Sequence, residues 1–95
     1  MSQVTVYLSS IASVRKTYNE CKWVTDTLDK HRIKYEVVDL GITPEKRADM
    51  EKGSGKKTVP QLFVGEKFIG GYEELEDLNE NEVLKQTLID AGYQE

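Results

Sequence analysis

Cys21 is the one sulfur nucleophile that this sequence offers for chemistry. Thiol–disulfide exchange on a CxxC couple needs a second cysteine, and so does an intramolecular disulfide, so neither can form here. Cys21 falls on the apolar face of a predicted helix. This position favours a small buried side chain over a redox-sensing thiol, because apolar burial raises the pKa of a cysteine. His31, the only histidine, has no partner at metal-ligand spacing, so we expect neither a metal nor a cofactor.

Two short motifs in the second half of the chain could build a binding site. The sequence reads TVP at residues 58–60 and GGYEE at residues 70–74. A helix that begins after the glycine pair would present backbone N–H groups able to hold a carboxylate. The alternative is that Pro60 is a trans proline on an edge strand and that the glycines only close a turn.

The elements that must position these motifs follow from the spacing of apolar side chains. Residues 4–8 alternate as in a strand, residues 14–31 change to a helical period, and residues 33–40 predict a second strand. In such a unit, a right-handed crossover joins two parallel strands. Trp23 falls opposite the apolar stripe of the helix, where an exposed tryptophan is a candidate contact anchor; the alternative is that it lies over the stems of Lys22 or Lys30. The stripe itself consists of Val14, Tyr18, Cys21, Val24 and Leu28.

A short helix and a hairpin are predicted next. Thr43 would cap the helix, with Pro44 at its first position and its end near Glu51. Gly65-Glu66 then separates two apolar runs, which is typical of a two-residue type II′ hairpin loop.

The chain closes with helical sequence. One helix is expected over residues 72–78, and Asn79 with Glu82 resembles a capping box for a last helix. The whole order, β-α-β-α-β-β-α, predicts an α/β fold with a four-stranded mixed sheet flanked by helices, as a single domain over residues 1–95.

Composition limits the partners. The net charge is −4 and the pI is near 5.0, which argues against nucleic acid, because phosphate binding needs a clustered basic face. The basic cluster Lys52, Lys56 and Lys57 is typical of a solvated loop. No apolar run is long enough for a membrane span, and the N-terminus carries no signal-peptide pattern, so we expect a cytoplasmic protein without a membrane partner.

The TVP and GGYEE motifs, joined by a hairpin at the right distance, resemble a glutaredoxin. The resemblance implies a thioredoxin-like fold in which Pro60 is cis at the start of the third strand and the backbone of Val59 forms a docking edge. It also places the two catalytic cysteines of that family at about Ala12 and Arg15, and a frequent lysine at Ser9. None of the three positions carries the family's residue, so mixed-disulfide chemistry has no nucleophile there.

The run over residues 6–39, together with residues 60–61 and 71–73, is similar to the SH3-domain-binding glutamic-acid-rich-like proteins. These are cysteine-site-free relatives of glutaredoxins, and the resemblance implies a cytosolic interaction module without oxidoreductase activity. Pro44 and Pro60 are the only prolines, so no PxxP motif exists, which argues against SH3 binding. The chain also ends at Glu95 without a long acidic tail.

We therefore predict a non-catalytic module that binds a protein or peptide partner in the former thiol-substrate groove. One alternative is a site for glutathione or a related thiol, with Glu73 near its amino group. Another is an enzyme that uses Cys21. The residues expected to form one contiguous docking surface are Ser10, Ala12, Ser13, Arg15, Thr58, Val59, Pro60, Gly71, Tyr72 and Glu73.

Overall fold

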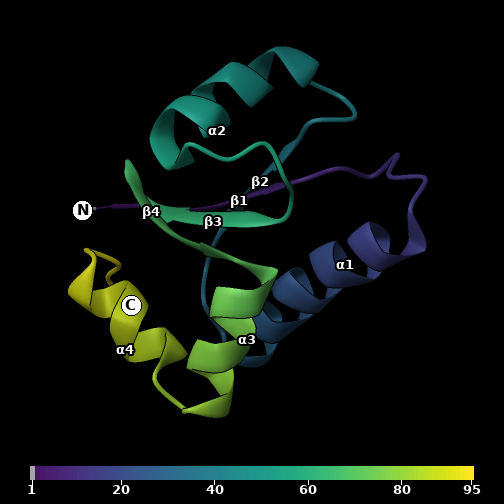
Figure 1. Cartoon of the computed structure of the whole chain (residues 1–95). Coiled ribbons are helices and arrows are strands. Elements are labelled where there is room, and N and C mark those ends of the chain that lie inside the picture. Colours follow the sequence, from purple (N-terminus) through teal and green to yellow (C-terminus); the bar gives the residue numbers. More distant parts are fainter. Residues whose placement is uncertain (1) are drawn as a thin grey trace.

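The computed structural model describes residues 2–95 and contains a four-stranded sheet with helices on both faces (Figure 1). The strands lie in the order β2-β1-β3-β4. The elements follow one another as β1 (Val4–Leu8), α1 (Arg15–Lys30), β2 (Glu36–Asp39), the 3-10 turn η1 (Pro44–Lys46), α2 (Arg47–Ser54), β3 (Gln61–Val64), β4 (Lys67–Gly71), α3 (Tyr72–Glu80) and α4 (Leu84–Asp90).

The first half is the predicted βαβ unit. β1 and β2 are parallel, with Val6 opposite Val37, and α1 connects them. α1 lies beside α3 on one face of the sheet, whereas α2 lies on the other face (Figure 1). This arrangement confirms the thioredoxin-like architecture expected from the order of elements.

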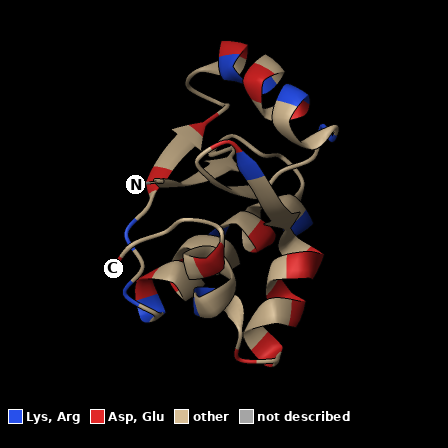
Figure 2. Cartoon of the chain, turned by 90° about the vertical axis from the view of Figure 1, so that its left-hand side faces the viewer, with Lys and Arg blue, Asp and Glu red and all other residues tan. Residues whose placement is uncertain are grey.

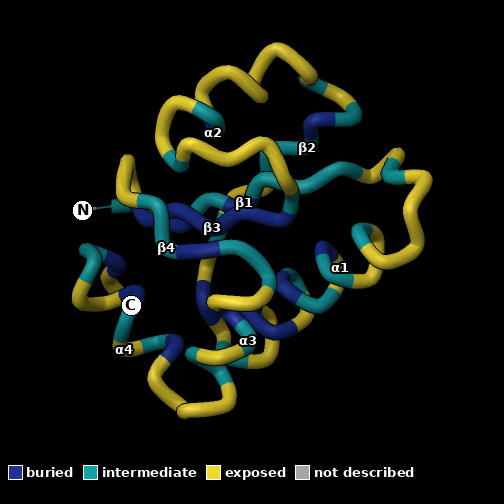
Figure 3. The backbone as a smooth tube through the Cα atoms, viewed as in Figure 1, coloured by how far each residue is buried: buried dark blue, intermediate teal, exposed yellow. Residues whose placement is uncertain are grey.

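The second half is the predicted hairpin. β3 runs antiparallel to both β1 and β4, which makes the sheet mixed. Gly65 has a φ of 59°, the left-handed value that the first position of a type II′ turn requires and that glycine adopts without strain. β3 is buried along its whole length at the centre of the sheet (Figure 3).

Each face of the sheet has its own core. The larger core joins β1 and β3 to α1, α3 and α4 and includes Val6, Leu28 and Leu62, all of which are buried. The smaller core lies under α2 and consists of Leu40, Met50 and Phe63. β3 contributes to both, so it connects the two layers.

The short helix differs from the sequence prediction at both ends. Thr43 makes no side-chain cap; its hydroxyl instead donates to the backbone C=O of Asp39 at 3.1 Å. The helix begins as a 3-10 turn and continues to Ser54, three residues beyond the expected end at Glu51. It stops at Gly55, which adopts a φ of 74° that closes a helix without steric cost.

The capping box expected at Asn79 and Glu82 is wrong. Asn79 lies inside α3, and its Oδ1 is 2.9 Å from Nε2 of His31 at the end of α1. α4 begins only at Leu84 and has no side-chain cap. A tertiary contact between two helix ends therefore uses the amide that the sequence pattern assigned to a local cap.

The apolar stripe of α1 is buried from Cys21 onward. Val24 and Leu28 enter the core, whereas Val14 and Tyr18 are 59% and 51% exposed. Trp23, expected on the exposed face, is half-buried, packs against the larger core, and contacts Tyr72 of α3 edge-on. Burial therefore increases along the helix toward its C-terminus (Figure 3).

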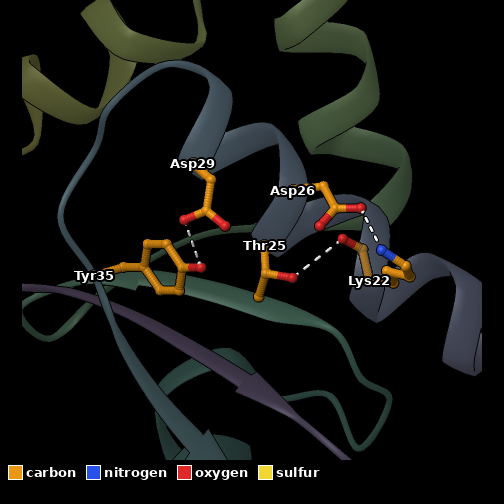
Figure 4. A network of polar contacts seen from close by, with 5 residues as sticks. All are labelled: Lys22, Thr25, Asp26, Asp29 and Tyr35. Atoms are coloured by element: carbon orange, nitrogen blue, oxygen red, sulfur yellow. Dashed lines mark hydrogen bonds and ion pairs between the residues drawn. The ribbon is translucent and has the colours of Figure 1, made fainter.

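Polar contacts secure the same half of α1. Lys22 pairs with Asp26 at 2.8 Å, and Tyr35, in the segment before β2, donates to Asp29 at 2.9 Å. Figure 4 shows both contacts. Burial and this hydrogen bond raise the pKa of Tyr35 to about 12.

The two ends of the described chain meet beside the hairpin turn. The backbone N–H of Ser2 donates to the C=O of Gly92 at 3.4 Å, and Gly65 donates to the C=O of Gln3 at 2.8 Å. A Cβ at Gly65 or Gly92 would lie 3.0–3.3 Å from the side chain of Ser2, so both positions pack tightly against it. Within residues 2–95, no helix is long and apolar enough to cross a membrane.

Candidate binding groove

A groove of about 230 Å³ lies where the start of β3, the end of β4 and the first turn of α3 approach α1. It brings together the two motifs that nine residues separate in the sequence. Its lining consists of Lys16, Glu20, Lys56, Thr58, Val59, Pro60, Gln61, Phe68, Gly71, Tyr72, Glu73 and Glu74. Six of the ten predicted site residues are in this set: those of residues 58–60 and those of residues 71–73.

Val59 and Pro60 form one wall of the groove. The peptide bond between them is cis, as the resemblance implies. Pro60 is buried, and Val59 is half-buried against the smaller core. Within residues 2–95, no hydrogen bond engages the backbone N–H or C=O of Val59, so both groups are available to an extended ligand.

Gln61 holds that wall in place and was not predicted. Its side chain is 1% exposed, and its Nε2 donates to the C=O of Thr58 at 2.7 Å and of Lys56 at 3.1 Å. Oε1 has no hydrogen-bond partner within the described residues. A glutamine in an otherwise apolar strand is the one sign in the sequence that a buried amide fixes this loop.

The first turn of α3 closes on itself. The backbone N–H of Gly71 donates to Oε1 of Glu74 at 2.7 Å, so the protein's own carboxylate occupies the position expected to hold a ligand's carboxylate. Tyr72 donates to Glu76 at 2.6 Å, and this bond raises the pKa of the phenol. Glu73 is exposed and lines the groove.

Side chains of both charges line the groove. Acidic residues follow one another along α3 (Figure 2), and Glu73 extends this acidic surface to the rim. Lys16 and Lys56 provide cations on the remaining rim, and the Lys56 ammonium lies 5.9 Å from the ring centroid of Phe68. A zwitterionic or amphipathic ligand fits such a rim better than a uniformly charged one.

The loop before α1 does not line the groove. Ser10, Ala12 and Ser13 lie outside its lining, and Arg15 lines a neighbouring hollow instead. Asp39 anchors the loop by accepting from the backbone N–H of Ser10 at 3.0 Å and of Gly41 at 2.9 Å. Hydrogen bonds from Ser10 lower the pKa of the Asp39 carboxyl.

The N-terminal end of α1, called its mouth below, is electropositive but carries no thiol nucleophile. Its first turn contains Arg15 and Lys16 and no acidic residue, and the N-cap Val14 makes no side-chain cap. A thiol at this helix end would have a lowered pKa, because the helix dipole and the cations stabilise a thiolate. The residues where the resemblance places cysteines, Ala12 and Arg15, offer no such group.

Cys21 lies elsewhere. It is 5% exposed in the second turn of α1, outside the groove lining, and burial raises the pKa of its thiol. A backbone hydrogen bond with Ser9 opposes that rise only in part. The prediction of a small buried side chain at this position is confirmed.

Comparisons with known proteins agree with this architecture. The glutaredoxin family model matches residues 4–69. The chain is 34% identical over 90 residues to a glutaredoxin domain-containing cysteine-rich protein of Drosophila melanogaster, covering 93% of this chain and 20% of that protein. It is 34% identical over 85 residues to glutaredoxin-1 of monkeypox virus, covering 83% of this chain and 79% of that one. The chain thus spans about a fifth of the length of the Drosophila relative.

Solved structures show the same fold. A buckwheat glutaredoxin–glutathione complex superimposes with a TM-score of 0.75 at 21% identity, covering 99% of this chain and 83% of that one. The actin interacting protein Aip5 of C. albicans gives a TM-score of 0.77 at 27% identity, covering 94% and 90%. With most of its length matched by the family model and a mixed four-stranded sheet flanked by helices, this chain belongs to the glutaredoxin family.

Proposed function

We propose that this glutaredoxin-family chain is a non-enzymatic binding module whose groove takes an extended segment of a protein partner. The observation that carries the proposal is the wall at Val59. Its backbone N–H and C=O are unused within residues 2–95 and border a groove that contains no sulfur. A peptide that pairs with this edge would gain backbone hydrogen bonds as an added strand does.

The chemistry at the mouth of α1 supports a role without catalysis. Disulfide exchange begins with attack by a thiolate, and Ala12 and Arg15 cannot supply one. Cys21 is buried with a raised pKa, which lowers its thiolate fraction at neutral pH. The electropositive helix end therefore retains the environment for a thiolate without the thiolate.

Actin is the first partner to test. Aip5 of C. albicans, named as an actin interacting protein, resembles this chain in fold and at 27% identity. Its name suggests that this scaffold can serve in protein association, and the comparison extends over 94% of the present chain.

The proposal is tested by three measurements on the wild type and its variants. A glutathione-coupled assay of disulfide reduction should show no activity for the wild type, and activity that disappears in Cys21→Ser would contradict the proposal. Co-sedimentation with filamentous actin and capture of cellular partners should then compare the wild type with Val59→Asp and Lys56→Glu. Bound protein is expected to be lost in both variants and kept in Lys67→Glu, an exposed charge change on β4 outside the groove lining.

Glutathione is the second candidate ligand, because a glutaredoxin of the same fold has been solved in complex with it. Lys16 and Lys56 favour a carboxylate on the rim, but Glu74 already occupies the N–H of Gly71. A titration with millimolar glutathione, followed by amide NMR, distinguishes the two candidates. Changes in the amide chemical shifts of Val59 and Gly71 would support glutathione as the ligand. Unchanged shifts would leave a peptide as the remaining candidate.

We also infer that the chain belongs with the SH3-domain-binding glutamic-acid-rich-like branch of cysteine-site-free relatives. Arg15, the segment around Tyr35, and the pair Val38-Asp39 support this grouping. With no PxxP motif, an SH3 domain is not the partner expected of this member. Binding of an SH3 domain to the purified chain would contradict that expectation.

A further inference from the structure

A second hollow adjoins the groove between α1 and α3. It measures about 630 Å³ and is lined by Arg15, Lys16, Asn19, Glu20, Trp23 and Tyr72. Three of these residues, Lys16, Glu20 and Tyr72, also line the groove beside Pro60. The two hollows therefore form one continuous surface, and a segment bound at Val59 has a path over Tyr72 to Trp23.

The aromatic pair gives this hollow an apolar floor. Trp23 and Tyr72 are both half-buried, their ring centroids are 5.2 Å apart, and their planes meet at 78°. Tyr72 is held by its hydrogen bond to Glu76, so little side-chain freedom remains to be lost on binding. Tryptophan, tyrosine and arginine are the residue types that dominate binding energy at protein interfaces, and all three meet here.

The charges of the hollow are asymmetric. Arg15 is exposed and makes no ion pair within residues 2–95, and Lys16, whose side chain is 80% exposed, reaches Glu20 only at 4.0 Å. On the side of α3, the carboxylates of Glu76 and Glu80 act on Tyr72, and Glu20 acts on it from α1. An anionic group is thus favoured toward the first turn of α1 and disfavoured toward α3.

We propose that this hollow binds the same partner segment as the groove, through an aromatic side chain packed on Trp23 and Tyr72 and a neighbouring carboxylate paired with Arg15 and Lys16. The inference rests on the proposed function, because it extends the groove that the module would use. It assigns the partner a chemistry: an acidic segment with an aromatic anchor.

Trp23 makes a direct test possible, because it is the only tryptophan of the chain and its fluorescence reports on this hollow. The probe is the capped peptide acetyl-Phe-Asp-Asp-amide, titrated into the full chain at low salt. Two matched peptides serve as controls: acetyl-Phe-Lys-Lys-amide reverses the charge, and acetyl-Ala-Asp-Asp-amide removes the anchor. We expect a saturable change in Trp23 emission with the probe and a dissociation constant about threefold to tenfold weaker for each control.

Arg15→Glu should weaken the binding of the probe by a similar factor. Lys67→Glu makes the same change in net charge on β4 and should leave the binding of the probe unchanged. Circular dichroism confirms that each variant is folded. Equal binding of the three peptides, no saturable change, or an Arg15→Glu variant that binds like the wild type would overturn the inference. If a partner is lost in Val59→Asp but kept in Arg15→Glu, the hollow is excluded and the groove proposal stands.

Discussion

The two halves of α1 have different roles in this molecule. The C-terminal half packs Val24 and Leu28 into the larger core and is held by polar contacts at Asp26 and Asp29. The N-terminal half leaves Tyr18 exposed, has no side-chain cap, and carries cations where the helix dipole disfavours them. Core packing and polar contacts stabilise α1 in the half that supports the fold. The end next to the position where relatives would place a catalytic thiol has no side-chain cap and carries charges that the helix dipole disfavours.

Truncating one side chain in each half gives the largest contrast. Leu28→Ala should lower the free energy of unfolding by about 2–5 kcal/mol, because it opens a cavity in the core where Leu28 is 1% exposed. Tyr18→Ala, in the exposed half, should change it by no more than about 0.5 kcal/mol. Urea denaturation of both variants measures the contrast, and equal losses would show that the two halves contribute alike.

A cysteine placed at the helix mouth would sharpen the comparison. In a Cys21→Ala background, Ala12→Cys should react with iodoacetamide at pH 7 about 10- to 100-fold faster than the wild-type thiol, because the helix end stabilises a thiolate and burial suppresses one at Cys21. Lys67→Cys in the same background provides an exposed thiol without a helix. If the thiol introduced at position 12 has the same pKa as this control thiol, the mouth of α1 is not electropositive.

Asp39 tests whether the loop before α1 is anchored by charge. Replacement by Asn should lower the free energy of unfolding by about 1–2 kcal/mol at pH 7, because the carboxylate that accepts hydrogen bonds from Ser10 and Gly41 is lost. The pKa of Asp39 is lowered by folding, so its contribution is present above the unfolded pKa and is lost as the pH falls through the folded pKa. Denaturation curves of the variant and the wild type should therefore differ at pH 7 and approach each other as the pH is lowered to 3, and Asp49→Asn serves as a surface control.

The smallest effect concerns the contact between Tyr35 and the C-terminal half of α1. Tyr35→Phe should lower the free energy of unfolding by about 0.5–1.5 kcal/mol, because it removes the hydrogen bond to Asp29. Folding raises the pKa of Tyr35 to about 12, so this stabilisation is complete below the unfolded pKa near 10 and is lost as the pH rises toward 12. Melting temperatures from pH 8 to 11 should decline less steeply for Tyr35→Phe than for the exposed control Tyr18→Phe.

Sequence patterns predicted most of the fold because local and tertiary preferences agree in it. The alternation in β1, the glycine at position 65 and the period of α1 each determine an element by themselves. The errors arose where a side chain that the sequence assigned to a helix cap bonded to another residue instead. Asn79 pairs with His31 rather than capping α4, and the hydroxyl of Thr43 donates to Asp39 rather than capping η1.

The groove was predicted on one side only. Residues 58–60 and 71–73 carry motifs that identify them without any partner. Lys16 and Glu20 enter the lining because α1 packs beside α3, which spacing along the chain does not reveal. Gln61 and Glu74 act through hydrogen bonds between their side chains and backbone groups, and such pairs become visible only in three dimensions.

The junction of Ser2 with Gly92 has a consequence for architecture. Because the first strand starts within hydrogen-bonding distance of the segment where the last helix ends, a host protein could accept this unit in a surface loop without separating the loop's two stems. The same proximity would permit circular permutation, with a short linker joining the old ends and new ends opened in the exposed stretch between β1 and α1.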